Sequence, residues 1–390
     1  MNEMEMMQLS KLLNVLVGEP PRRVTVGAVR RKVAMRRLIA GATATATAAF
    51  AVSAGLVISA HALGKHPVPT AKPRITEPRY YFEEAFGPRG GPQQEVVRST
   101  ATGTITARVS CPGRDPYLSA VAAAGGEKFF LACLQDNPQG VTTGTKIYRF
   151  ALTRSGRVTG FGLETGGNLS GLRVGALAAS PDGAELAAGV APARSDSITH
   201  HLSDIVVINT RTGKHALWHA GHLRGGIRFS FWNLSFARNG GVLAVFGWGR
   251  CPMPPACKSP IQEMIAVSHP GAGGQIANGR VLFTRSSLTS NRHTWIDEAF
   301  ITPDGATATA VVSPSSGRAG SSVVQISTAT GKLSGVLYRS RRNLAISPDP
   351  SGRFILATTD SLKHPIFGWI DHGKLAPLRP ADKVVFMEAW

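Results

Sequence analysis

Downstream of residue 77, apolar and polar positions alternate in short runs, and turn-forming residues separate one run from the next. Alternation of this kind is typical of β-strands that are buried on one face. In three segments an apolar strand, a Pro-Asp turn and a second strand follow each other, and each segment therefore predicts a β-hairpin. These segments are 176–190, 298–312 and 344–359, and degenerate copies lie at 233–248 and 119–134.

A second hairpin follows each copy of the first, and a glycine recurs in its turn. Two hairpins make a four-stranded antiparallel sheet, and units of roughly 40–60 residues that repeat such a sheet predict the blades of a β-propeller. We therefore expect an all-β, six-bladed propeller, whereas a seven-bladed ring would need a further hairpin within one of the loops. The turn glycines are Gly103, Gly156, Gly213, Gly273, Gly331 and Gly373.

The two ends of the repeat region complement each other. One apolar strand, 384–390, remains after the last hairpin, whereas the first unit, 79–109, lacks its innermost strand. A sheet with an open edge is prone to pair with other chains. We therefore expect the C-terminal strand to complete the N-terminal blade and to close the ring.

Five short motifs carry a resemblance to known proteins: RYYF (79–82), VVRSTATG (96–103), LAASPDG (177–183), ITPDG (301–305) and EAW (388–390). The chain resembles WD-repeat-like and Tol-B-like propellers, in which SPDG turns recur at the same place. More narrowly it resembles actinobacterial single-pass membrane proteins with a degenerate propeller. The resemblance implies the fold and the membrane anchor, but it implies no activity, and the Trp-Asp dipeptide of true WD repeats is absent.

The N-terminal region predicts a membrane anchor. Residues 38–60 carry no charge, and as a helix they would span roughly 34 Å, enough for a bilayer core of about 30 Å. Five Lys/Arg residues at 30–37 precede this run, and such charges hold their end in the cytoplasm. We thus expect a cytoplasmic basic leader (1–37), a transmembrane helix (38–60), a Pro-rich stalk (61–77) and an extracytoplasmic propeller (78–390). A signal peptide cleaved near residue 62 is the alternative.

The charge balance and the loop lengths point to a binding surface. The formal net charge is +19, which favours anionic partners, although an Arg-rich genome would also explain it. The connections between hairpins and between blades are long and meet at one rim, and they carry Arg224, Arg228 and Arg250. Long loops on a rigid scaffold often hold function. We expect this rim to bind a protein or an anionic envelope polymer, and no nucleic acid; a solvated basic rim without a ligand is the alternative. The long connections are 135–145, 164–175, 191–203, 219–231, 249–262, 284–296 and 313–322.

Motifs for catalysis do not stand out. The sequence contains neither a G-x-S-x-G elbow nor a phosphate-binding Gly-Lys-Ser/Thr loop. Asp182 and Asp304 belong to Pro-Asp turns, which explains them without a catalytic role. We expect no catalytic residue, cofactor or metal site, because the histidine cluster lacks a matching set of carboxylates or thiolates. That cluster contains His200, His201, His215, His219 and His222.

The four cysteines predict two disulfides, because an exported domain is exposed to an oxidising environment. Cys251 and Cys257 bracket a short loop that a bond could close, which leaves Cys111 to pair with Cys133.

Taken together, these features predict a non-catalytic binding, sensing or scaffolding propeller. The alternative is a propeller enzyme of the lactonase or lyase type with an axial site, which would need clustered acids and histidines on the innermost strands.

Overall fold

A computed structural model describes most of the chain from residue 79 onward. The described residues are 79–86, 93–112, 117–124, 128–137, 139–193, 202, 204–223, 227–237, 240–250, 261–288, 294–314, 320–348, 355–359, 367–371, 373–378 and 386–387. Within this part, no helix is both long and apolar enough to cross a bilayer. The membrane helix predicted at 38–60 lies outside the described residues.

The described strands fall into six sheets. The first holds β26 (Phe386–Met387), β1 (Tyr80–Phe86), β2 (Gln93–Ser99) and β3 (Ile105–Ser110). The second holds β4 (Tyr117–Ala124), β5 (Lys128–Asp136), β6 (Thr142–Leu152) and β7 (Val158–Ser170). The third holds β8 (Leu172–Ala179), β9 (Glu185–Pro192), β10 (Asp204–Asn209), β11 (His215–His219) and β16 (Gly274–Gln275).

The other three sheets follow in chain order. The fourth holds β12 (His222–Leu223), β13 (Ile227–Phe236), β14 (Val242–Arg250), β15 (Ile261–Ser268) and β17 (Arg280–Thr284). The fifth holds β18 (Thr294–Ile301), β19 (Thr307–Pro314), β20 (Ser321–Ser327) and β21 (Leu333–Ser340). The sixth holds β22 (Leu344–Pro348), β23 (Ile355–Thr359), β24 (Phe367–Asp371) and β25 (Lys374–Pro377). Three short helices, η2 (Pro270–Ala272), η3 (Ile276–Asn278) and α3 (Arg285–Leu288), complete the description.

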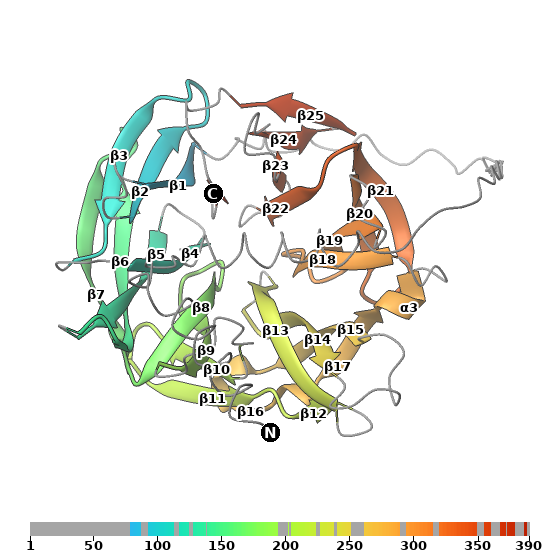
Figure 1. The fold of residues 1–390 in the computed structure, drawn as a ribbon, viewed down its shortest axis with the longest axis horizontal. Helices are drawn as coiled ribbons and strands as arrows, with labels where there is room; N and C mark the ends of the chain where they lie inside the picture. The colour runs from blue at the N-terminus through green and yellow to red at the C-terminus, as the bar shows by residue number, and fades with distance from the viewer. Residues whose placement is uncertain are drawn as a thin grey trace, which may run out of the picture.

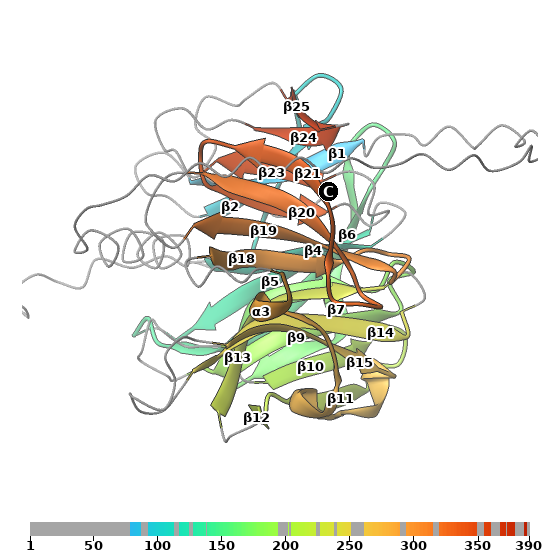
Figure 2. The same ribbon diagram turned by 90° about the vertical axis from the view of Figure 1, so that its right-hand side faces the viewer.

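The sheets stand around a central axis, and β4, β8, β13, β18 and β22 are the strands of their sheets drawn nearest to it (Figure 1). Figure 2 shows the same sheets from the side. The class of fold predicted from the sequence, an all-β propeller, is confirmed. The C-terminal strand β26 pairs antiparallel with β1 at Glu83 and Glu84, so the two ends of the repeat region meet in one sheet as expected.

Local hydrogen bonds explain why the Pro-Asp segments turn where they do. In the third sheet the Ser180 hydroxyl donates to the Asp182 carboxylate at 2.6 Å, and the Ala184 amide donates to the same oxygen at 3.0 Å. Gly183 follows with φ of 68°, a conformation that glycine adopts without strain. Asp304 repeats this arrangement with Thr302 and Ala306. Both aspartates therefore have the turn role predicted for them.

Apolar side chains between neighbouring sheets form the core. One cluster joins the third and fourth sheets around Phe229 and Phe231, and another joins the first and second around Phe82 and Phe129. Buried polar side chains also connect the sheets. Gln262 on β15 donates to the Ile296 carbonyl at 2.7 Å and accepts from the Ile296 amide at 3.0 Å. The two bonds provide partners for the backbone N–H and C=O of Ile296, next to which a β-bulge interrupts the strand pairing.

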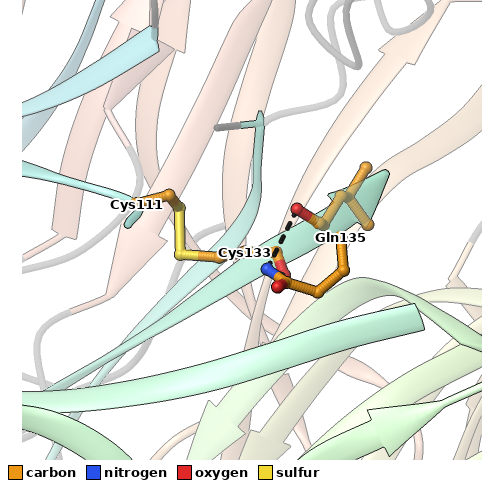
Figure 3. The surroundings of a disulfide bond; sticks show 4 residues. Cys111, Cys133 and Gln135 are labelled. Atoms are coloured by element: carbon orange, nitrogen blue, oxygen red, sulfur yellow. Dashed lines mark hydrogen bonds between the residues drawn. A yellow bond between two sulfur atoms is a disulfide. The ribbon is translucent and has the colours of Figure 1, made fainter. Parts of the chain in front are cut away.

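A disulfide links the first and second sheets. It joins Cys111, which follows β3, to Cys133 on β5, with the Cα atoms 5.6 Å apart. Figure 3 shows the bond beside Gln135, whose side-chain amide donates to the Cys133 carbonyl at 3.4 Å. This predicted pair is confirmed. Cys251 and Cys257 lie outside the described residues.

Two predicted connections are wrong. Residues 164–170 belong to β7, and a single residue, Gly171, links them to β8, so that no long loop exists at 164–175. Residues 219–231 are largely strand as well, because β13 begins at Ile227. The Gly-rich sequence of 165–171 suggests a loop, but an outermost strand has few side chains to pack and tolerates glycine and polar residues.

Candidate functional site

The predicted binding arginines lie on two neighbouring strands of the fourth sheet. Arg228 is the second residue of β13, Arg250 ends β14, and the two residues are register partners. Arg224 lies outside the described residues. Both strand ends belong to the rim at which β14 and β19 end, opposite the hairpin turns. We call this the long-loop rim.

Three of the chain's six tryptophans lie on β13, β14 and β18, where the fourth and fifth sheets meet. The Trp232 and Trp248 ring centroids lie 6.3 Å apart at an interplanar angle of 69°. The Trp232 indole N–H donates to the Asp297 carbonyl at 2.9 Å, which ties the fourth sheet to β18. Trp295 is the second residue of β18, close to the long-loop rim. All three side chains are half-buried.

A cation completes this group. The Arg285 guanidinium lies over the Trp295 ring, 5.7 Å from its centroid. A guanidinium over an indole face is attracted by the negative charge of the ring face and remains able to bind an anion. We call Trp232, Trp248, Trp295 and Arg285 the tryptophan surface. It has the composition of protein-binding surfaces, which are enriched in Trp and Arg.

The carboxylates near the tryptophan surface have structural partners. Asp297 accepts a hydrogen bond from the Ser313 hydroxyl, and Glu298 accepts one from the Ile346 amide at 2.7 Å. The second of these bonds joins the fifth sheet to the sixth. The arrangement therefore offers aromatic faces and positive charge for binding, and its carboxylates hold strands together.

The tryptophan surface was not predicted from the sequence. Its members come from three strands and a short helix, and only the folded sheets bring them together. A signal was present, because Trp232 directly precedes the predicted hairpin 233–248 and Trp248 ends it, while Trp295 lies three residues before the predicted hairpin 298–312. Aromatic residues placed at one rim in successive repeats would have pointed to this junction.

An open depression of about 380 Å³ lies at the opposite rim, among the hairpin turns of the third and fourth sheets. The turn between β15 and β17 builds one wall, and the Trp218 indole holds this turn by donating to the Pro270 carbonyl at 2.6 Å. His269 in this turn has φ of 52°. The depression is lined by Ser180, Asp182, Ala184, Glu185, Asn209, Gly240, Gly241 and 269–272.

The two carboxylates of the depression differ in pKa. The Ser180 hydroxyl and the Ala184 amide hold the pKa of Asp182 below its usual range. Burial, and then the charge of Asp182, raise the pKa of Glu185. Glu185 Oε2 is buried without a hydrogen-bond partner. Opposed pKa shifts occur at catalytic sites, but ordinary turns produce them too.

Two members of the histidine cluster, His215 and His219, have separate partners in the described part of the chain. His219 Nδ1 lies 2.8 Å from an Asp204 carboxylate oxygen, and His215 Nε2 lies 2.7 Å from the Gly166 carbonyl, which belongs to the second sheet. His200 and His201 lie outside the described residues. Among the residues that the structure describes, no three His, Cys, Asp or Glu side chains are grouped so as to hold a metal ion.

No family model matches the sequence, and no curated protein sequence matches it. Several solved structures resemble the fold at low identity. The periplasmic gluconolactonase of Pseudomonas aeruginosa is 14% identical over 79% of this chain and 98% of its own, with a TM-score of 0.43. The β-propeller domain of Cps50 (Swd1) from Myceliophteria thermophila is 10% identical over 80% and 90%, with a TM-score of 0.41. A putative TolB from Agrobacterium tumefaciens is 12% identical over 73% and 84%, with a TM-score of 0.43. Because these values are low, the description of the chain as a propeller rests on its own sheets.

Proposed function

We propose that this protein is a non-catalytic binding propeller, anchored by one membrane-spanning helix with the propeller outside the cytoplasm. It holds a protein or an anionic envelope polymer at the long-loop rim of the fourth and fifth sheets. The observation that carries the proposal is the tryptophan surface, in which half-buried indoles and a stacked guanidinium come together at the junction of the two sheets. Arg228 and Arg250 are positions on the same two strands, β13 and β14, as Trp232 and Trp248. Indole faces supply apolar contact area, and the arginines supply charge that steers and orients an anionic partner.

The test measures retention of the full chain on an envelope fraction at low and at high salt. Reversing Arg224, Arg228 and Arg250 to Glu should weaken binding at least about tenfold, equal to about 1.4 kcal/mol. High salt should weaken wild-type binding, because exposed charges are screened beyond about 8–10 Å. The matched control reverses Arg211, Lys214 and Lys332, which are exposed at the opposite rim, and should bind like wild type. Equal loss of binding in both triple variants, or wild-type retention that does not change with salt concentration, would contradict the proposal.

The alternative function is a propeller enzyme of the lactonase or lyase type. The depression with Asp182 and Glu185 is the feature that favours this alternative, because the pKa of Asp182 is lowered and that of Glu185 is raised. Incubation of the purified chain with a sugar lactone, with and without added divalent metal, separates the two functions. Lactone opening that disappears in the Glu185→Gln variant would establish the enzyme and contradict the non-catalytic proposal.

A further inference from the structure

The outermost strand of the second sheet, β7, has the longest span of any described strand, at 13 residues. In the third sheet a further strand, β16, pairs with the outer side of β11, the strand that corresponds to β7. Within the described chain β7 pairs with β6 alone, so its other edge faces outward (Figure 1). An exposed sheet edge presents backbone donors and acceptors that can pair with another strand.

The first half of β7 combines this edge with exposed apolar side chains. Phe161 is 39% exposed and Leu163 is 47% exposed. The Phe161 ring stacks on Tyr148 of β6, with centroids 5.3 Å apart and planes 10° apart, so its position is fixed. A Cβ atom added at Gly160 or Gly162 would meet no atom within 4 Å. Open space therefore surrounds the strand where its apolar side chains are exposed.

The charge around this edge is positive. The β6–β7 hairpin, residues 142–170, contains four Lys/Arg residues and one carboxylate, Glu164. Arg149 forms an ion pair with Glu164 at 3.9 Å, and its side chain is 57% exposed whereas that of Glu164 is only 1% exposed. Arg154 and Arg157 in the turn are exposed as well. An occupant of this edge therefore meets cations and no exposed carboxylate from the hairpin.

We propose that the outer edge of β7 binds an extended acidic segment of a partner protein, which adds to the second sheet as a further strand. The backbone of residues 158–163 supplies the hydrogen bonds, Phe161 and Leu163 contact alternate apolar side chains of the segment, and the hairpin arginines pair with its carboxylates. Strand addition of this kind draws affinity from the main chain and specificity from alternate side chains. This edge lies on a different sheet from the tryptophan surface, so the two binding sites can be tested separately.

A second copy of this chain is a poorer occupant for electrostatic reasons. The chain carries a net charge of +19, and two hairpins of this composition placed edge to edge would bring their arginines together. Like charges opposite each other across a strand pair destabilise the pair. Charge complementarity thus favours an acidic partner.

The experiment measures binding of a fluorescent peptide of alternating Val and Glu, about ten residues long, to the full chain by anisotropy. Such a peptide covers the exposed part of β7 at about 3.4 Å per residue. The wild type should bind it, with weaker binding at high salt, and should bind an alternating Val and Lys peptide at least about tenfold less tightly. Hydrogen exchange at residues 158–163 should slow when the Val and Glu peptide is present.

Two variants locate the binding. Phe161→Ser with Leu163→Ser should weaken peptide binding at least about tenfold. Leu333→Ser with Val336→Ser is the matched control, because these side chains are 48% and 42% exposed on β21, the outermost strand of the fifth sheet. The control variant should bind like wild type, and both variants should melt like wild type. No peptide binding, or equal binding by the two variants, would overturn the proposal. A concentration-dependent dimer that only the Phe161 and Leu163 variant abolishes would instead assign the edge to a second copy.

Discussion

At the scale of single residues, the turn aspartates show how short sequence signals become structure. Asp182 and Asp304 each accept a hydroxyl and an amide hydrogen bond within a Pro-Asp turn. These bonds stabilise the carboxylate form and lower its pKa. The sequence predicted this role correctly because every partner lies within a few residues. Interactions of such short range can be read from a motif.

Asp304→Ala should therefore destabilise the propeller by about 1 kcal/mol near neutral pH, the usual net value of a hydrogen bond. Because the pKa of Asp304 is lower when folded, the stabilisation is present above the unfolded pKa of about 4 and is lost as pH falls through the folded value. Urea unfolding at several pH values tests this. A difference between variant and wild type that grows as pH falls below about 4 would contradict it.

Glu185 should show the opposite pH dependence. Burial raises its pKa, so the folded state favours the protonated form, and its ionisation costs stability as pH rises from the unfolded towards the folded pKa. Glu185→Gln should therefore stabilise the protein at neutral pH and have little effect below about pH 4. The same unfolding series measures it. Destabilisation by Glu185→Gln at neutral pH would show that the carboxylate has a favourable partner when folded.

At the scale of elements, the disulfide and the closing strand hold the first sheet to its neighbours. Cys111 and Cys133 are separated by 22 positions, and closing a loop of that size contributes about 3 kcal/mol in the chain-entropy picture. Cys111→Ala with Cys133→Ala should lower the free energy of unfolding by about that amount, measured by guanidinium unfolding. Reduction of the disulfide in the wild type should give the same guanidinium unfolding midpoint as the double variant. An unchanged midpoint in the double variant would contradict the assigned contribution.

Strand β26 joins the last part of the propeller to its first strand by pairing with β1. Deletion of residues 384–390 should expose the inner edge of β1 and the core beside it, which contains Tyr80 and Phe82. We expect a lower melting temperature and faster hydrogen exchange in residues 80–86, because an uncovered strand edge loses its backbone partners. A truncated chain that melts like the full chain, with unchanged exchange in β1, would contradict ring closure by β26.

Elements differ in how well the sequence predicted them. The hairpins were predicted correctly where Gly, Pro or Asp marks a turn, because those residues act on their own backbone. The loop at 164–175 was wrong because β7 continues through Gly166 and Gly167 in an irregular ladder with β6. The turn between β15 and β17 contains η2, β16 and η3, and the contacts that order it come from the third sheet. Long-range contacts of that kind leave no local signal.

At the scale of the whole molecule, the ring brings residues that are distant in sequence to shared surfaces. Trp232 and Trp295 are 63 positions apart, yet both contribute to the junction of the fourth and fifth sheets. The sequence predicted the rim and its arginines, and the structure adds the aromatic part of the surface. The two proposed binding regions, the tryptophan surface and the outer edge of β7, thus lie on different sheets and differ in chemistry.

The most direct test of the proposed function is hydroxyl-radical footprinting of the full chain by mass spectrometry, with and without an envelope fraction. We predict that Trp248 and Trp295 become less reactive when the partner binds. Trp369, a half-buried tryptophan on β24 of the sixth sheet, is the internal control and should keep its reactivity. Arg228→Glu with Arg250→Glu should abolish the protection. Unchanged reactivity of Trp248 and Trp295, or an equal loss of reactivity at Trp369, would contradict binding at the long-loop rim.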